Sequence, residues 1–476
     1  MTQTVDPQRA ATERKVVHPT AVVAIGCFCG IVVALTQTMI IPLIPLLPRL
    51  LHTSSSNASW TVTATLLTGA VTMPISGRLG DMVGKRLILV ISLCSLVVGS
   101  LLCAMTSSLV PVVAGRALQG LSMGAIALGI SIMRDELPAD MVGPAVARMS
   151  ATLGVGGAIG LPVSAIIVEK ADWHVLFWIA AALGLLCLIA VLAVIPESPV
   201  RSPARFDGIG ALGLAAGLVM VLLAITESGE WGWGDDRTIG LIVGGLVVFA
   251  CWGAWELRNT APLVDLRTSA KPQVLFTNVA SVATGFAMYG MSLMPIQLLV
   301  APGHTGYGEN LTLIQAGLVC MPSGLMMYLF SGVGARLSAR RGPRISLATG
   351  VLILGISYVA ILLLRDQWWE IGVATALLGV GIGIAYAAMP ALIMGAVPVT
   401  ETAAANGLNA LMRSVGTSLS SAVVATVLAQ WTIKLGGIKY PTDHAFTIAF
   451  LISLAASALA LVLALAIPKQ RVARPA

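Results

Sequence analysis

Arg116 is a charged residue inside the apolar stretch 109–133, in a chain where charged residues make up only 10% of the total. A charge inside a long apolar helix is costly and normally faces a polar cavity or a charged partner. Arg116 therefore either serves a function that needs a buried positive charge, or is a packing residue bonded to backbone carbonyls and to Gln119.

Carboxylates are the side chains that could carry a proton here, because all five histidines lie in loops or near predicted membrane interfaces. The acids near the ends of apolar stretches are Asp135, Glu136, Asp207 and Glu227. We expect Asp135 or Glu136, which directly follow Arg134, to exchange protons ahead of Glu227. The alternative is that these acids are solvated helix-end residues.

Four charged residues also occur together in the decapeptide "GRLGDMVGKR", which begins at Gly77 and ends at Arg86. Asp81 could accept amide hydrogens near a helix terminus and meet the positive end of the helix dipole. Gly77 and Gly84 permit a close backbone approach around this acid. Lys85 and Arg86 carry charges that fix the orientation of membrane helices. The decapeptide is therefore predicted to be a short, tightly turned loop between two spans.

No group of residues suggests an enzyme or a cofactor site. The seven cysteines all lie in apolar stretches, and none forms a C-x-x-C pair. Glycine-rich runs such as "GVGGAIG" lie inside apolar stretches, where G-x-x-x-G spacing favours close helix packing over phosphate binding. We expect no enzymatic activity, no metal and no cofactor.

The composition indicates that the elements positioning these residues lie in a membrane. The chain has 476 residues, is 57% hydrophobic and has a mean hydropathy of +0.92, well beyond a soluble domain. Apolar runs of about 20 residues are the helical spanning unit. Fourteen such stretches are predicted: 20–48, 60–80, 86–106, 109–133, 146–168, 174–195, 208–226, 239–257, 275–301, 311–335, 345–364, 370–396, 404–430 and 445–467.

Basic residues are distributed unequally between the two sides of the predicted membrane. With the N-terminus inside, 21 of the 28 Lys and Arg residues fall on the inner side and 6 on the outer side, and Arg413 is counted among the inner ones. This split follows the positive-inside rule and predicts a multi-pass cell-membrane protein with both termini cytoplasmic. The scattered charge argues against a nucleic-acid partner.

An internal repeat divides the chain into two halves. "RLGDMVGKR" and "RLSARRGPR" share Arg, Leu, Gly and Arg at an offset of 258 residues. Internal repeats that form two bundles around a central site are a transporter architecture. The predicted organisation is a cytoplasmic tail (1–19), an N-terminal six-helix bundle (20–200), a two-helix insert (201–270), a C-terminal six-helix bundle (271–468) and a second cytoplasmic tail (469–476).

These motifs resemble those of the major facilitator superfamily, and within it the fourteen-span drug/proton antiporters. "GRLGDMVGKR" matches the family's loop signature G-x-L-x-D-x-x-G-[RK]-[RK], and "RALQGLSMG" matches the fourth-span signature R-x-x-Q-G-x-x-x-G. The resemblance implies an all-α membrane fold of two six-helix bundles plus two central helices. It also implies proton-gradient-driven efflux of amphipathic small molecules by alternating access. In this family Arg116 would assist proton transfer and Asp81 would take part in a cytoplasmic lock.

One departure from the family pattern affects the proton site. Thr36, in "LTQTMIIPLIP", stands where these antiporters usually carry an acid, so coupling is expected to use an acid elsewhere. Thr36 lies at about the depth of Arg116, as judged from the helical rise. The candidate residues for a substrate cavity between the bundles are Thr36, Gln37, Gln119, Asn278, Tyr289 and Gln297.

Two other functions remain open from the sequence. The chain could be a dedicated exporter or facilitator of one endogenous metabolite, or a transport-dead membrane receptor or scaffold. Retention of Arg116 and Asp81 disfavours a scaffold, whereas loss of the first-span acid favours one. The expected partners are a small-molecule substrate, protons and bilayer lipids, with the protein acting as a monomer.

Overall fold

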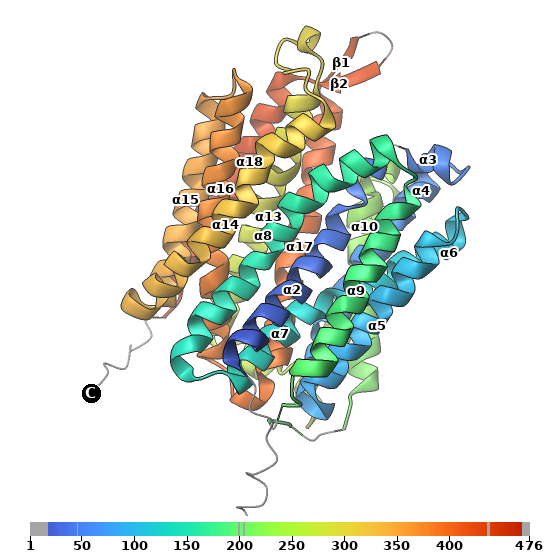
Figure 1. Ribbon diagram of the computed structural model, residues 1–476. Helices are drawn as coiled ribbons and strands as arrows, with labels where there is room; N and C mark the ends of the chain where they lie inside the picture. Colours follow the sequence, from blue (N-terminus) through green and yellow to red (C-terminus); the bar gives the residue numbers. More distant parts are fainter. Residues whose placement is uncertain (1–17, 45, 199, 203–204, 436–437, 469–476) are drawn as a thin grey trace, which may run out of the picture.

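Long helices that run side by side make up most of this protein, which we describe from a computed structural model (Figure 1). The structure describes residues 18–44, 46–198, 200–202, 205–435 and 438–468. Almost all of the two predicted tails, 1–19 and 469–476, therefore lies outside the described residues.

The helices follow the predicted order. The first half of the chain contains α2 (Pro19–Thr38), α3 (Leu47–Leu50), α4 (Ser55–Val83), α5 (Lys85–Ala104), α6 (Leu109–Gly120), α7 (Ala125–Glu136), α8 (Ala139–Lys170) and α9 (His174–Val194). The insert contains α10 (Gly208–Trp231), α11 (Asp236–Arg258) and the short α12 (Leu266–Ser269). The second half contains α13 (Pro272–Val300), α14 (Leu313–Arg341), α15 (Pro343–Leu363), α16 (Trp368–Met394), α17 (Thr402–Gln430) and α18 (Asp443–Ala466).

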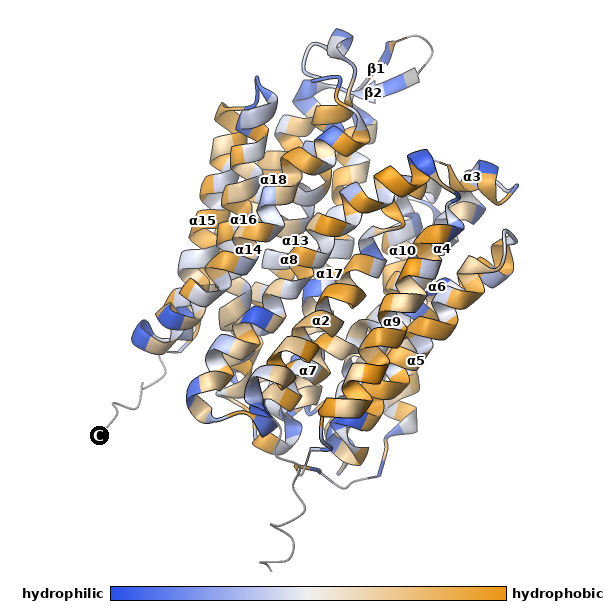
Figure 2. Cartoon of the chain, viewed as in Figure 1, coloured by the Kyte–Doolittle hydropathy of each residue, from blue (hydrophilic) through white to orange (hydrophobic). Residues whose placement is uncertain are grey.

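Thirteen helical segments of the described chain are long and apolar enough to cross a membrane. α6 and α7 form one of them, because the 3-10 turn Leu121–Gly124 joins them. The remaining predicted span, 60–80, lies within the 29-residue α4, which its threonines, Arg78 and Asp81 make less apolar than α5. Figure 2 shows hydrophobic residues along the sides of the helices and hydrophilic residues mostly near their ends. The predicted all-helical membrane fold is confirmed.

The repeat seen in the sequence is also present in the structure. Gly84 ends α4 with φ +131°, and Gly342 ends α14 with φ +90°, values that L side chains rarely adopt. Arg86 then donates to the carbonyl of Leu192 at the end of α9 (2.7 Å). Arg344 likewise donates to a carbonyl at the end of α18, that of Leu465. The same turn is therefore followed by the same arginine contact in each half.

The two halves meet along two seams, where small residues allow close helix approach. In the first seam α4 packs against α17, and a Cβ on Gly77 would collide with the carbonyl oxygen of Ala403. In the second seam α8 packs against α14, and a Cβ on Gly324 would collide with the carbonyl oxygen of Gly154. We call the end of the bundle where α4 finishes and α17 begins the Asp81 end.

The insert lies against the first seam. Leu214, Leu218 and Leu222 of α10 form one buried apolar cluster with Leu67 of α4 and Leu411 of α17. α11 packs on α10 and leaves most of its own surface exposed. At the opposite end of the bundle, β1 (Thr432–Leu435) and β2 (Ile438–Pro441) form an antiparallel hairpin, visible at the top of Figure 1.

Candidate functional site

Most of the decapeptide 77–86 is helical, so the prediction of a loop is wrong for this segment. Residues 77–83 form the final part of α4, and the chain turns at Gly84 alone. The positive φ at that position favours glycine strongly, and a Cβ there would also press against the carboxylate of Glu197. Gly77 has a different role, since it permits the contact with Ala403 in the other half.

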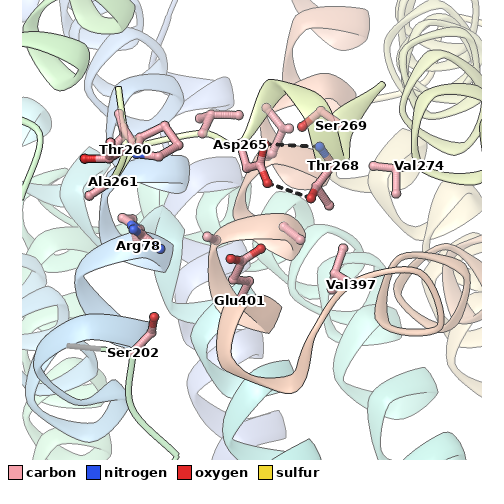
Figure 3. A pocket seen from close by; sticks show the side chains of 16 residues that line it. Arg78, Ser202, Thr260, Ala261, Asp265, Thr268, Ser269, Val274, Val397 and Glu401 are labelled. Atoms are coloured by element: carbon pink, nitrogen blue, oxygen red, sulfur yellow. Dashed lines mark hydrogen bonds between the residues drawn. The ribbon is translucent and has the colours of Figure 1, made fainter. Parts of the chain in front are cut away.

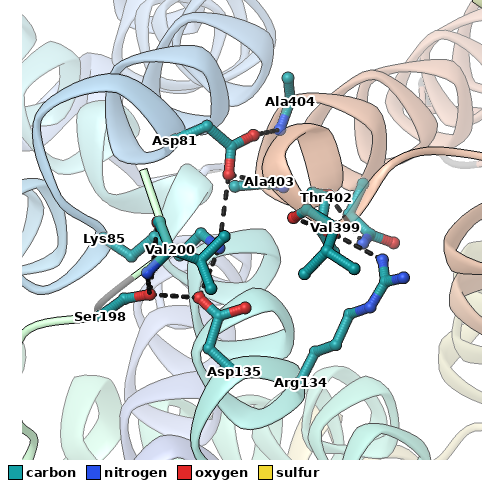
Figure 4. Close-up of polar contacts among 11 residues, drawn as sticks. Asp81, Lys85, Arg134, Asp135, Ser198, Val200, Val399, Thr402, Ala403 and Ala404 are labelled. Carbon is teal, nitrogen blue, oxygen red and sulfur yellow. Dashed lines mark hydrogen bonds and ion pairs between the residues drawn. The ribbon is translucent and has the colours of Figure 1, made fainter. Parts of the chain in front are cut away.

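Asp81 lies between the two halves of the chain (Figure 4). It is 1% exposed. Its carboxylate accepts hydrogen bonds from the amides of Ala403 (3.3 Å) and Ala404 (2.9 Å), both in the first turn of α17. Amides in a first helical turn have no partner within the helix, and the N-cap residue of α17, Glu401, makes no side-chain capping bond. Asp81 therefore caps a helix of the opposite half and meets the positive end of its dipole.

Lys85 connects Asp81 to a second acid within the first half. Its buried Nζ lies 2.6 Å from Asp135 Oδ2 and 3.5 Å from Asp81 Oδ1. The Ser198 hydroxyl also donates to Asp135 Oδ2, while Asp135 Oδ1 is buried without a hydrogen-bond partner among the described residues. A buried ion pair of this kind needs both partners, because removing one leaves an uncompensated charge.

Arg134 adds a second connection between the halves. Its guanidinium donates to the Thr402 hydroxyl (2.5 Å) and to the Met394 carbonyl (3.1 Å), both in the second half. From the sequence, Arg134 is recognisable only as the neighbour of two acids. Its position at the end of an apolar stretch did not reveal a partner more than 250 residues away. We call Asp81, Lys85, Asp135, Ser198 and Arg134 the Asp81 network.

A cavity of about 290 Å³ lies beside this network, between α4, α17 and the segment 260–269 (Figure 3). Arg78, only 8% exposed, lines it together with Glu401 and Asp265. Burial acts to raise the pKa of Asp265, but hydrogen bonds from the Thr268 side chain and the amides that Asp265 caps outweigh it, so the pKa is lowered and the carboxylate stays ionised. The six predicted substrate-cavity residues do not line this cavity.

Arg116 lies in a separate cluster, deep within the first half, and is 2% exposed. Its guanidinium donates to the carbonyls of Thr61 (3.0 Å) and Thr36 (3.2 Å) and to Gln119 Oε1 (2.6 Å). Gln119 in turn donates to the Ser100 hydroxyl (2.8 Å). Among the described residues Arg116 has no ion-pair partner, so its charge is solvated by neutral oxygens alone.

The structure places the predicted Thr36 beside Arg116, although the contact is through the Thr36 carbonyl. The hydroxyl of Thr36 instead donates to the carbonyl of Val33 (2.8 Å) within α2. Gln37 is half-buried on the same helix. A threonine in this position therefore presents no ionisable group to the arginine.

Two of the predicted cavity residues make polar contacts between α13 and α17 in the second half. Asn278 Oδ1 accepts from Asn409 (2.9 Å), and about three helical turns further along α13 the Tyr289 hydroxyl accepts from Ser421 (3.2 Å). Asn409 also accepts from Arg413 (2.7 Å), whose guanidinium lies 5.0 Å from the ring centre of Tyr386.

The assignment of Arg413 to the cytoplasmic charges is wrong. Arg413 lies inside α17 and inside the predicted span 404–430, so it is a second intramembrane arginine. The signal was present in the sequence, since the residue interrupts a stretch already predicted to cross the bilayer.

The remaining predicted site residues are Glu136, Glu227 and Gln297. Glu136 is the last residue of α7 and directly follows Asp135 of the Asp81 network. Glu227 is 4% exposed near the end of α10. It lies about 28 Å along this helix from Gly208, where α10 begins at the Asp81 end. Gln297 is half-buried in the last turn of α13.

Known proteins that resemble this chain are transporters. A tetracenomycin C resistance and export protein of Streptomyces glaucescens is 26% identical over 415 residues, covering 86% of this chain and 75% of that protein. The riboflavin transporter RibZ of Clostridioides difficile is 24% identical over 379 residues, covering 79% of this chain and 80% of that protein.

The fold also matches a solved structure, that of the human organic anion transporter MFSD10. The TM-score is 0.64 at 15% identity, and the match covers 94% of this chain and 99% of that one. At this identity the likeness concerns the fold. The model of the Major Facilitator Superfamily matches residues 26–421 and 280–476, across both halves, and the chain therefore belongs to this superfamily of non-enzymatic membrane transport proteins.

Proposed function

We propose that this protein exports amphipathic small molecules, such as drugs or antibiotics, across the cell membrane by alternating access. The observation that carries the proposal is the cap that Asp81 of the first half places on α17 of the second half. Such hydrogen bonds are short-ranged, so they can hold one end of the bundle closed and be lost when the halves rock apart. The export function named for the Streptomyces glaucescens relative supports the direction of transport.

We infer that the Asp81 end is cytoplasmic and that both termini lie on that side. The basic residues of the predicted inner loops, including Arg340 and Arg341 at the end of α14, support this orientation. The two six-helix halves, 20–200 and 271–468, would then rock about a site near mid-membrane. The half-buried Arg413 would provide a polar contact at this site, whereas Arg116 would act from within the first half.

We assign proton coupling to Asp135, ahead of Glu136 and Glu227. Asp135 is paired with Lys85 while the Asp81 end is closed, and one of its oxygens has no partner among the described residues. Protonation of Asp135 would remove the charge that holds Lys85 and so weaken the network. In this way, binding of a proton would shift the equilibrium from the closed to the open Asp81 end.

The test is transport by the purified protein in liposomes with an imposed pH gradient. Substrate counterflow should occur, and net flux should change the lumenal pH in step with substrate movement. Asp135→Asn should keep exchange but abolish accumulation, whereas Asp140→Asn, an exposed acid at the start of α8, should leave both unchanged. Flux that ignores pH and builds no gradient would identify a facilitator.

A second candidate, a dedicated exporter of one metabolite, is favoured by the riboflavin transporter among the relatives. A counterflow panel that includes flavins beside polyketide antibiotics separates the two. Exchange limited to one compound class would replace the broad-efflux proposal.

A further inference from the structure

Two carboxyl groups meet inside the insert, at the Asp81 end of the bundle. Asp207 forms the N-cap of α10, and Glu256 lies in the last turn of α11. Both side chains are buried, with Glu256 2% and Asp207 8% exposed. A Cβ built on Gly210 would touch both Asp207 Oδ2 and Glu256 Oε1, so these two oxygens lie within about 5 Å of each other.

The two acids have very different hydrogen-bonding environments. Asp207 accepts from the amide of Gly210 (2.8 Å), from Asn259 Nδ2 (2.6 Å) and from Trp255 Nε1 (3.0 Å). These donors are neutral, and together they stabilise the ionised form of Asp207. Asp207 is therefore the member of the pair that is equipped to hold a negative charge.

The donors around Glu256 are less well placed than those around Asp207. Neither of its carboxyl oxygens accepts a hydrogen bond of normal geometry from the described residues. The amides of Leu263 and Val264 and the indole of Trp252 lie nearby, and that indole nitrogen is itself buried without an acceptor. An ionised Glu256 would thus be a poorly solvated charge next to another negative charge, which is strongly unfavourable.

No cation compensates the pair among the described residues. Neither acid takes part in an ion pair, and the charged group that acts on Glu256 is Asp207. The other charged groups of the surrounding elements interact elsewhere. Arg205, Arg258 and Arg267 are exposed, and Arg267 donates to the Leu257 carbonyl. Asp265 caps α12, and Arg78 and Glu401 line the neighbouring cavity.

We propose that Asp207 and Glu256 form a proton-binding site in the insert, in which Glu256 holds one proton beside the ionised Asp207. The site is distinct from the Asp81 network and does not depend on the proposed transport reaction. It lies beside the cavity of Figure 3, because Leu263 and Val264, whose amides lie near Glu256, line that cavity together with Arg78 and Ser202. The Ser202 amide also donates to the Asp81 carbonyl (2.7 Å). Proton loss would place two negative charges at the end of a helix that packs on both α4 and α17.

The experiment uses N,N′-dicyclohexylcarbodiimide, a hydrophobic reagent that reacts with protonated carboxyl groups. The acid O–H adds across one C=N bond, its proton passing to nitrogen, and the O-acylisourea rearranges to a stable N-acylurea. The intact protein in lipid nanodiscs is labelled across a pH series from about 5 to about 9, and labelled peptides are quantified by mass spectrometry.

We expect Glu256 to be labelled at neutral pH, with a midpoint well above the value of about 4.3 for an ordinary glutamate. Asp207→Asn, which keeps the capping shape, should move that midpoint down by about one pH unit because the neighbouring negative charge is gone. The matched control is Asp265→Asn, another helix-capping acid of the same insert, which should leave the midpoint unchanged.

Two results would overturn the proposal. One is a wild-type midpoint near that of an ordinary glutamate, which decides the question even if the Asp207 variant does not fold. The other is a midpoint that moves equally, or not at all, in the Asp207→Asn and Asp265→Asn proteins. Liposome transport plays no part in either readout, so failure of the transport proposal would leave this test intact.

Discussion

Replacing Asp81 with asparagine should open the Asp81 end of the transporter. The carboxylate makes two contacts with amides of α17, at 3.3 Å to Ala403 and 2.9 Å to Ala404, and a third at 3.5 Å with Lys85. Asparagine keeps one acceptor oxygen, but its amide group would face either a backbone N–H or the ammonium of Lys85. At least one of the two α17 amides then loses its acceptor.

The size of the effect follows from these contacts. A buried amide without an acceptor costs about 1–3 kcal/mol. The lost charge at a partly buried helix terminus contributes up to about 2 kcal/mol more. Lys85 retains its 2.6 Å pair with Asp135, so that interaction is not lost. Closure at this end should therefore weaken by about 2–4 kcal/mol, a change of about thirtyfold to several hundredfold in the ratio of closed to open molecules.

Spin-label distances between the two halves at the Asp81 end report this ratio, because rocking apart would separate the ends of both seams there. Labels at Gly143→Cys in α8 and Ala339→Cys in α14, both exposed at the Asp81 end, would be placed in a protein freed of its seven cysteines. Asp81→Asn should add a longer distance population, and Asp140→Asn, an exposed acid at the same end, should not. If the Asp81→Asn distribution matches that of the control, Asp81 is a local helix cap with no part in closure.

Three further results are expected from single changes. Arg116→Ala should abolish transport while the protein still reaches the membrane, as measured by flux per inserted molecule; normal flux would make the residue a packing element. Gly77→Ala should weaken closure by about 1–3 kcal/mol because its methyl group must displace the Ala403 carbonyl, and the same spin-label distances would show it. A thiol at exposed Gly234 should react with an impermeant reagent from outside and one at Gly143 should not, and the reverse pattern would invert the proposed orientation.

The helices were predictable because the bilayer demands long apolar stretches, and each of the fourteen stretches corresponds to helical structure. The loop prediction for 77–86 is wrong because a concentration of charge does not distinguish a loop from the end of a helix. Charged residues can extend a helix beyond the apolar core, and here only the positive φ of Gly84 interrupts it. The equivalent Gly342 gives the same turn, so the repeat was a better guide than the charge.

The hydrogen-bond and packing partners of the site residues could not be predicted from the sequence. Asp81 binds α17 across 323 positions of chain, and nothing in the local pattern indicates that contact. Glu256 lies just inside the predicted span 239–257, whereas the acids predicted to carry protons lie just outside their spans, and its acidic partner Asp207 is 49 residues away in the chain. Its burial depends on Gly210 in a different helix, which permits the approach of both carboxylates.

The two seams between the halves differ in their polar contacts, as a comparison of equivalent positions in the repeat shows. Position 339, the counterpart of Asp81, is an exposed alanine, so α14 offers no carboxylate to α8. No hydrogen bond joins α8 to α14 within the described residues, and their contact rests on small residues such as Gly154 and Gly324. Apolar contacts of this kind tolerate sliding, whereas the hydrogen bonds of Asp81 do not survive a small separation.

This difference predicts which seam has to switch when the Asp81 end opens. The α4–α17 seam must lose its hydrogen bonds, and α10 lies directly on it through Leu214, Leu218 and Leu222. When the two halves separate, a helix that contacts both of them moves with one half and loses its contacts with the other. The insert therefore contacts the switching seam by packing, and Ser202 links it to the Asp81 carbonyl. Its buried acids lie at the same end of α10, so a change in their charge would affect which half the insert follows.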